Sequence, residues 1–155
     1  MPIIAPGTPA PAFRVKTEAG ADFTHEDLVG DTTVLVFFPN AFSGVCTDQF
    51  QIYEQVLDDV AAEGARLLGV SVDATYSQTA FRESMGVTIP MLSDFEPKGE
   101  MAKAFGVYFE STGVANRALV VTDADAVVRW SWEGEHPGVL PGANLIFDGL
   151  GAVRS

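Results

Sequence analysis

Apolar and polar residues follow two different periods in the first half of the chain. Residues 34–38 and 67–72 are short, largely apolar runs, which is typical of strands covered on both faces of a sheet. Between these runs, apolar residues recur at steps of three and four, and acidic and amide residues take the other side. This periodicity predicts one amphipathic helix over residues 47–63, with Gly64 as its stop signal.

The rest of the chain adds shorter elements of both kinds. Residues 1–12 are rich in proline and alanine, and we expect them to form an extended arm. After this arm we expect, in chain order, a hairpin of 13–16 with 22–24, a helical turn at 25–30, a helix from about 76 to 86 capped by Asp73 or Thr75, a strand at 89–93, a helix over 94–105, paired strands at 118–122 and 127–132, and a helix at 144–153. This order predicts an α/β fold with a mixed central sheet flanked by helices. A length of 155 residues corresponds to one domain, residues 1–155.

The charge balance argues against several classes of partner. The formal net charge is -12, from 21 acidic and 9 basic residues, and the basic residues are scattered. We therefore expect no nucleic-acid partner and no anionic membrane surface. No apolar run reaches the ~18–20 residues that span a bilayer, and no secretory signal is seen, which predicts a cytoplasmic protein. One cysteine, with His25 and His136 far apart, predicts no disulfide within the chain, no metal site and no cofactor.

The only cysteine, Cys46, stands where the buried run 34–38 gives way to the predicted helix. A lone cysteine is most often a small buried apolar residue. Three features favour a reactive thiol instead: the strand-to-helix turn, the nearby Pro39, which has no N–H, and Ser43, whose hydroxyl can donate to sulfur or to a bound oxygen. The N–H groups and dipole at the start of a helix favour the thiolate, which is the nucleophilic form.

Residues 39–46, Pro-Asn-Ala-Phe-Ser-Gly-Val-Cys, resemble the peroxiredoxin signature Pro-x-x-x-Thr/Ser-x-x-Cys. Three later segments are similar to the same family: Leu-Ser-Asp-Phe-x-Pro-x-Gly at 92–99, Phe-Gly-Val at 105–107, and Gly-Val-Ala-Asn-Arg at 113–117, followed by a strand. The resemblance covers nearly the whole chain and is closest to the AhpE-type one-cysteine group of the AhpC/TSA superfamily. It implies a thioredoxin-like fold and the reduction of hydroperoxides.

The resemblance also implies roles for individual residues. Cys46 would be the peroxidatic cysteine, whose thiolate attacks the distal peroxide oxygen and becomes a sulfenic acid. Ser43 would hydrogen-bond the peroxide, and Pro39 would shield the sulfenate from water and over-oxidation. Arg117 would hold the thiolate and the peroxide oxygens together with its planar fork of donors. The backbone N–H groups of Val45 and Cys46 would face the same pocket and stabilise charge on the oxygens.

Two further residues complete the expected substrate site. Gln49 stands where the family often has glutamate, and its neutral amide can still accept a hydrogen bond from Arg117. Phe42 is expected either in the core or at the pocket mouth and dimer face, where the family carries aromatic residues. Ser43 stands where many relatives have threonine, which keeps the hydroxyl donor and removes a methyl group.

The absence of a second cysteine decides how the sulfenic acid is reduced. An external thiol must do so, either a low-molecular-weight thiol or a thioredoxin-, glutaredoxin- or mycoredoxin-like protein. The leading hypothesis is thus a one-cysteine peroxiredoxin that reduces hydrogen peroxide, organic hydroperoxides or peroxynitrite, and the resemblance implies a homodimer. Two alternatives stay open: a peroxide-sensing protein that passes oxidation of Cys46 to a partner thiol, and a scaffold with an inert cysteine.

Overall fold

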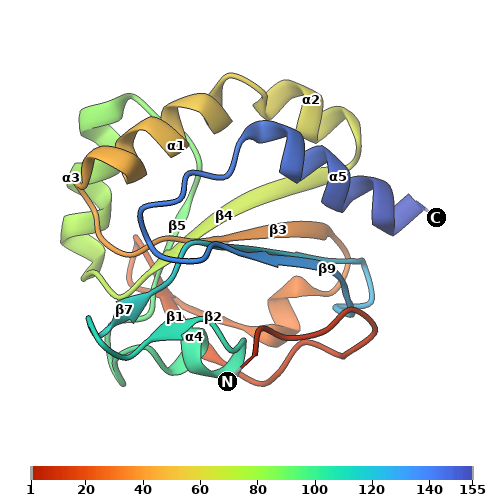
Figure 1. The fold of residues 1–155 in the computed structure, drawn as a ribbon, viewed down its shortest axis with the longest axis horizontal. Coiled ribbons are helices and arrows are strands. Elements are labelled where there is room, and N and C mark those ends of the chain that lie inside the picture. The colour runs from red at the N-terminus through yellow and green to blue at the C-terminus, as the bar shows by residue number, and fades with distance from the viewer. Residues whose placement is uncertain (1, 155) are drawn as a thin grey trace.

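The computed structural model describes residues 2–154, and a seven-stranded sheet forms the centre of this part of the chain (Figure 1). The strands lie in the order β2-β1-β5-β4-β3-β8-β9. Their bounds are β1 (Arg14–Thr17), β2 (Asp22–Thr24), β3 (Thr32–Phe37), β4 (Ala65–Ser71), β5 (Met91–Ser93), β8 (Ala118–Thr122) and β9 (Val128–Glu133). Strands β3, β4 and β5 are parallel to one another, and all other neighbours pair antiparallel. The predicted mixed sheet is confirmed.

Helices cover both faces of the sheet. One face carries α1 (Gly44–Glu54), α2 (Leu57–Ala62), α3 (Thr75–Met85) and α5 (Ala143–Arg154) (Figure 1). The other face carries η1 (His25–Leu28), α4 (Glu100–Ala104) and a small antiparallel pair, β6 (Tyr108–Phe109) with β7 (Val114–Ala115). No helix within residues 2–154 is long and apolar enough to cross a bilayer.

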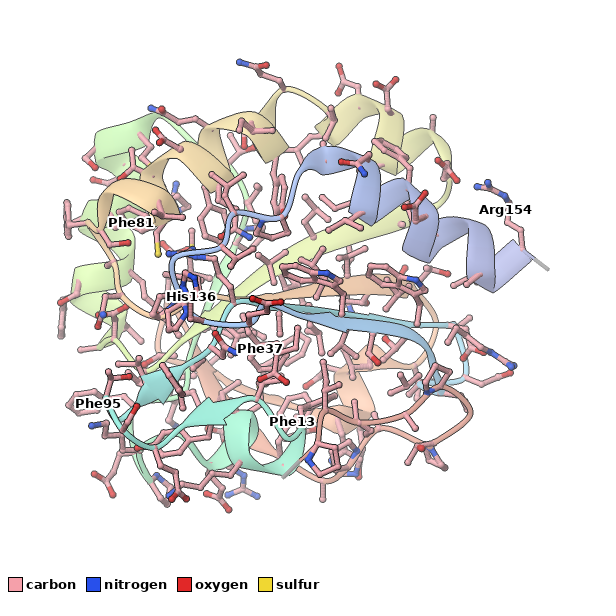
Figure 2. The ribbon with its side chains drawn as sticks, viewed as in Figure 1. Phe13, Phe37, Phe81, Phe95, His136 and Arg154 are labelled. Atoms are coloured by element: carbon pink, nitrogen blue, oxygen red, sulfur yellow. The ribbon has the colours of Figure 1, made fainter. Side chains whose placement is uncertain are left out.

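The uninterrupted apolar run of β3 follows from this two-sided cover. Val34 and Val36 pack with α1, α2 and α5, whereas Leu35 and Phe37 pack with η1 and α4, and all four side chains are buried. Figure 2 shows Phe37 below the sheet and Phe81 of α3 on the opposite side. Each fully buried side chain of this size contributes about 1.5–3 kcal/mol through removal of apolar surface from water. This burial holds the central strand firmly in the sheet, and the site begins at its end.

The helix predicted over 47–63 is in fact two helices, so that prediction was wrong. α1 ends at Glu54, and Val56, with φ of -110° and ψ of 10°, separates it from α2. The change of direction lets Val60 reach the core against β4. Because apolar residues continue at three- and four-residue steps across the break, periodicity alone does not reveal it.

One predicted helix start and one predicted helix cap were also wrong. The helix expected from residue 94 begins only at Glu100, because the carboxylate of Asp94 accepts the N–H groups of Met101 and Ala102 at 2.9 Å each and so caps it from a distance. Helix α3 is preceded by Ala74, which makes no side-chain cap bond. The short strands β6 and β7 were not anticipated.

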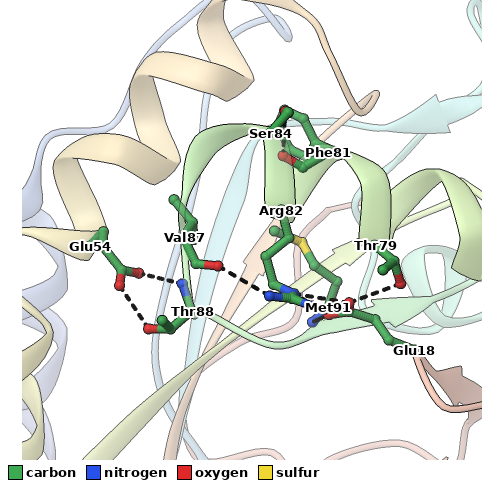
Figure 3. A network of polar contacts seen from close by, with 9 residues as sticks. All are labelled: Glu18, Glu54, Thr79, Phe81, Arg82, Ser84, Val87, Thr88 and Met91. Carbon is green, nitrogen blue, oxygen red and sulfur yellow. Dashed lines mark hydrogen bonds and ion pairs between the residues drawn. The ribbon is translucent and has the colours of Figure 1, made fainter.

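The β1–β2 hairpin is tied to the helical layer by a carboxylate (Figure 3). Glu18 lies in the hairpin turn, and its two carboxylate oxygens accept from Arg82 Nε at 2.9 and 3.0 Å. The same carboxylate accepts from Thr79 Oγ1 at 3.0 Å and from the Met91 N–H at 3.1 Å. Three segments distant in sequence therefore meet on one side chain.

Helix α5 lies close against β8 and β9. A Cβ at Gly149 would come within 2.7 Å of Val121 and 2.8 Å of Trp130, so only glycine permits this approach. Trp130 and Trp132 both pack against this helical layer. The glycine that weakens α5 as an isolated helix is thus what allows it to dock.

Candidate active site

Ser43 starts helix α1 and places Cys46 in its first turn. The extended backbone of Ser43, with φ of -70° and ψ of 149°, makes it the N-cap, and its Oγ accepts the Cys46 N–H at 3.2 Å. The Ser43 carbonyl in turn accepts from Thr47 Oγ1 at 3.0 Å. The helix begins at Gly44, earlier than the predicted residue 47, and Cys46 lies in its first turn, as expected. The side chain of Cys46 is fully buried.

A pocket of about 290 Å³ opens where β3 ends and α1 begins. It is lined by Pro39, Asn40, Ser43, Gly44, Val45, Thr112, Val114, Arg117, Pro137 and Gly138. The structure thus brings together four of the predicted site residues. Pro39 and Ser43 come from the turn, Val45 from the start of α1, and Arg117 from the segment just before β8. Cys46 directly follows the lining residue Val45.

Arg117 is a buried cation at the wall of this pocket. Arg117 is only 1% exposed, and its guanidinium forms no ion pair with a carboxylate within residues 2–154. Nη1 donates to Gln49 Oε1 at 2.8 Å, and Nε donates to the Pro137 carbonyl at 2.5 Å. These bonds use two of the five guanidinium N–H groups, and both acceptors are neutral. A buried cation without a counter-charge favours the binding of an anion.

Gln49 extends this contact away from the pocket. Its Nε2 donates to the hydroxyl of Tyr53 at 3.2 Å, and that hydroxyl donates to the Pro141 carbonyl at 2.8 Å. Burial raises the pKa of Tyr53 to about 12, so the hydroxyl stays protonated at physiological pH. The hydrogen bond between Arg117 and Gln49 that the sequence suggested is present. Gln49 itself lies behind the guanidinium rather than in the pocket wall.

Asp73 holds the turn that leads into α1. Its Oδ2 accepts the N–H of Ala41 at 2.8 Å and the hydroxyl of Ser71 at 2.7 Å. Phe42, which follows Ala41, has φ of 68°, a value that residues other than glycine rarely adopt. The ring of Phe42 packs edge-on against Phe81, with ring centroids 5.3 Å apart. The turn is therefore held by a hydrogen bond to the Ala41 backbone and by the packing of the Phe42 ring.

Several expectations about single groups need correction or completion. The N–H of Cys46 does not point freely into the pocket, because Ser43 Oγ accepts it. Val45, one residue earlier, is in the first turn, where an N–H has no acceptor within the helix. Phe42 is 58% exposed and is not part of the pocket wall. His136 is exposed, as expected, next to the lining residue Pro137.

Three residues of the site were missed by sequence reasoning. Asp73 was predicted only as a helix cap, and no role was predicted for Tyr53 or Pro137. The one available signal was the polar end of a buried strand for Asp73, since such ends gather functional groups in α/β sheets. The other two act through a hydroxyl and a carbonyl that only the tertiary fold brings to Arg117 and Gln49.

Comparison with known proteins decides the family. The AhpC/TSA family model matches residues 6–131. The chain belongs to this family. "Alkyl hydroperoxide reductase E" of Mycobacterium tuberculosis is 32% identical over 150 residues, covering 96% of this chain and 97% of the relative. "Peroxiredoxin 2" of Thermoplasma acidophilum is 31% identical over 128 residues, covering 80% of this chain and 64% of the relative. With its single cysteine, the chain is a one-cysteine peroxiredoxin, a thiol-dependent peroxidase.

Solved structures support the fold of this peroxiredoxin. Enterococcus faecalis AhpC superposes with a TM-score of 0.87 at 23% identity, over 96% of this chain and 92% of that structure. The BcpB peroxidoxin of Mycobacterium tuberculosis gives 0.82 at 24% identity, over 97% of both chains. The predicted thioredoxin-like fold is confirmed.

Proposed function

We propose that this peroxiredoxin reduces hydrogen peroxide, organic hydroperoxides or peroxynitrite at Cys46, with Arg117 as the cation that holds the reacting oxygens. One observation carries the proposal most directly. A buried guanidinium that meets only neutral partners lines the pocket at the start of the helix that bears the only cysteine. The N–H groups that Arg117 does not use on Gln49 and Pro137 can bind a thiolate and a peroxide oxygen together.

The first half of the reaction oxidises the sulfur. The Cys46 thiolate attacks the distal oxygen of the peroxide, the S–O bond forms as the O–O bond breaks, and the electron pair leaves on the proximal oxygen. That oxygen takes a proton and departs as water or an alcohol, or leaves as part of nitrite when peroxynitrite is the substrate, and Cys46 becomes a sulfenic acid. Negative charge spreads over both oxygens during this step, so preorganised donors lower its barrier.

The turn supplies the remaining groups. Because Ser43 Oγ accepts the Cys46 N–H, its own hydroxyl proton is left to donate to the peroxide. The N–H of Val45 is a second donor from the first turn of α1. Pro39 is buried in the pocket wall, where it keeps water from the sulfenate without offering a competing N–H. Gln49 orients Arg117, and the ring of Phe42, packed on Phe81, helps to hold the turn that carries Ser43.

The second half of the reaction needs an external thiol. Its sulfur attacks the sulfenic sulfur, water leaves, and a mixed disulfide with Cys46 forms. A second thiol then releases Cys46 and carries away the disulfide. A low-molecular-weight thiol or a thioredoxin-, glutaredoxin- or mycoredoxin-like protein fits this role.

Mass spectrometry after one equivalent of peroxide, with dimedone present, tests the chemistry. We expect a single dimedone adduct on Cys46, absent in Cys46→Ser, and peroxide consumption that depends on added thiol. An unmodified Cys46 after full exposure to peroxide would rule out the proposal. A specific mixed disulfide with one cellular protein, without turnover, would favour the alternative of a redox-signalling protein.

Arg117→Ala should slow Cys46 oxidation by ~10²–10³-fold, which is the effect of removing one electrostatic donor. Stopped-flow fluorescence of Trp130 and Trp132 can follow the oxidation, because both lie on β9, next to the strand that follows Arg117. Arg129→Ala is the matched control, since Arg129 is half-exposed and pairs with Asp123. Equal rates in folded Arg117→Ala and wild type would remove Arg117 from the site.

We also propose that the chain acts as a single domain, residues 1–155, that forms a homodimer in the cytoplasm. The support for a second copy is a face with exposed aromatic rings. Tyr76 is 87% exposed and Phe95 54% exposed, and both line a groove of about 690 Å³ whose wall carries both charge signs. Light scattering should show a dimer that Tyr76→Glu dissociates. A wild-type monomer at micromolar concentration would contradict this.

A further inference from the structure

A buried hydrogen-bonded chain runs from the pocket wall to the segment before α5. Arg117 Nη1 donates to Gln49 Oε1 at 2.8 Å, Gln49 Nε2 donates to Tyr53 at 3.2 Å, and Tyr53 donates to the Pro141 carbonyl at 2.8 Å. The residues Arg117, Gln49 and Tyr53 are at most 1% exposed. Solvent water therefore does not reach these side chains to replace a hydrogen bond that is lost.

The chemistry of the groups allows only one direction along this chain. A guanidinium can only donate, so Gln49 must turn its oxygen toward Arg117 and its NH₂ toward Tyr53. A peptide carbonyl can only accept, so the Tyr53 proton must point to Pro141. The hydroxyl oxygen is then left as the acceptor that the amide NH₂ needs. The guanidinium at one end, which only donates, and the carbonyl of Pro141 at the other end, which only accepts, require the same orientation of the chain.

We propose that Tyr53 is a positioning residue for peroxide reduction: its hydroxyl fixes the amide of Gln49 with the oxygen toward Arg117, and so holds the guanidinium in the pocket wall. The inference rests on the proposed role of Arg117. Tyr53 touches neither the pocket nor the reacting atoms and acts only through Gln49.

Removal of the hydroxyl has a defined consequence. In Tyr53→Phe the ring still fills its site, but Gln49 Nε2 loses its acceptor and Pro141 loses its donor. The amide keeps its oxygen toward Arg117, which can only donate, but its buried NH₂ is left without an acceptor and gains by shifting toward another one. The guanidinium shifts with the amide, away from the position in which its remaining donors face the pocket, and this slows a step that depends on its placement.

Stopped-flow oxidation of Cys46 by hydrogen peroxide, without reductant, tests the inference. We expect Tyr53→Phe to be about 10-fold slower than wild type, within the range that couples residues in contact. Tyr108→Phe is the matched control, because it removes a tyrosine hydroxyl from β6 and should leave the rate unchanged. The ratio of peroxide oxidation to alkylation by iodoacetamide should also fall in Tyr53→Phe, since alkylation needs no oxygen held by Arg117.

A second background separates positioning from simple anchoring. In Gln49→Glu the carboxylate accepts through either oxygen, so it needs no neighbour to set its orientation. Adding Tyr53→Phe to Gln49→Glu should therefore change the oxidation rate by less than 2-fold. The same 10-fold loss in both backgrounds would show that Tyr53 merely anchors Pro141, and it would overturn the inference.

The results also separate this inference from the proposed function. If wild type is oxidised rapidly, Arg117→Ala is slow, and Tyr53→Phe matches wild type, only the role of Tyr53 is wrong. If wild type forms no sulfenic acid, the proposed function itself is wrong. Thermal unfolding of each variant, followed by circular dichroism, confirms that the rates are compared among folded proteins.

Discussion

Asp73→Ala should both destabilise the fold and slow the oxidation of Cys46. The Oδ2 of Asp73 accepts from the Ala41 N–H at 2.8 Å and from the Ser71 hydroxyl at 2.7 Å. These bonds hold a turn in which Phe42 has φ of 68°. Such a backbone conformation costs of order 1–3 kcal/mol and persists only where its surroundings enforce it. Without the carboxylate, we expect the turn to relax and the hydroxyl of Ser43, the following residue, to move.

The two lost hydrogen bonds set the expected magnitude. A hydrogen bond to a charged group contributes ~1.5–3 kcal/mol. Asp73 is half-buried, so water replaces part of what is lost, and relief of the strain at Phe42 returns a little more. We expect the free energy of unfolding to fall by about 2–3 kcal/mol in total, which lowers Tm by roughly 4–12 °C in a chain of this size. A shift of the Ser43 hydroxyl by about 1 Å should slow oxidation ~10–100-fold.

Two measurements on the same variants test both parts. Calorimetry gives Tm, and stopped-flow tryptophan fluorescence gives the rate of oxidation by peroxide. Asp73→Asn should lie between wild type and Asp73→Ala, because one amide oxygen still accepts the Ala41 N–H. Asp59→Ala, which removes an exposed acid of α2, should change neither quantity. An Asp73→Ala protein with wild-type Tm and wild-type rate would refute the idea that this carboxylate holds the turn.

Two further predictions concern the rest of the fold. Glu18→Ala should lower the free energy of unfolding by about 2–4 kcal/mol, since the carboxylate is 17% exposed and pairs with Arg82 at 2.9 Å. Urea denaturation of Glu18→Ala, Arg82→Ala and the double variant should show that the two losses are coupled. Losses that simply add would contradict this pairing. Burial raises the pKa of Asp94 from 3.8 to about 6, so the folded state binds more protons between these values and stability falls as pH rises through them, by roughly 3 kcal/mol in all. Relative to wild type, Asp94→Asn should therefore become more stable by about 2 kcal/mol from pH 4 to pH 7. Urea midpoints that stay parallel across this range would contradict the raised pKa.

The sequence predicts those elements whose pattern is set by the core. The strand over residues 118–122 was predicted with the bounds that the structure shows, because it is a short apolar run between turn signals. The last helix differs by one residue at each end. The break between α1 and α2 could not be predicted, since it depends on how Val60 meets β4 and not on local pattern. The late start of α4 depends likewise on the distant carboxylate of Asp94.

The candidate site divides in the same way. Pro39, Ser43 and Cys46 lie within eight residues of one another, so a linear motif contains them. Arg117 lies 71 positions after Cys46, and only the family resemblance pointed to it. Tyr53 reaches the site through a neutral side chain and a carbonyl, groups that every sequence contains in abundance. A role that depends on which carbonyl lies nearby has no sequence signature.

The neutral partners of Arg117 account for both its cost and its use. A glutamate at position 49 would compensate part of the buried charge, whereas the neutral amide of Gln49 does not. Gln49 and the Pro137 carbonyl fix the guanidinium by hydrogen bonds alone and leave its full positive charge uncompensated. An anion beside the guanidinium, whether the Cys46 thiolate or a peroxide oxygen, therefore offsets part of the free energy of burying that charge. The same arrangement lowers the stability of the resting protein and raises its affinity for the charge that develops as the O–O bond breaks.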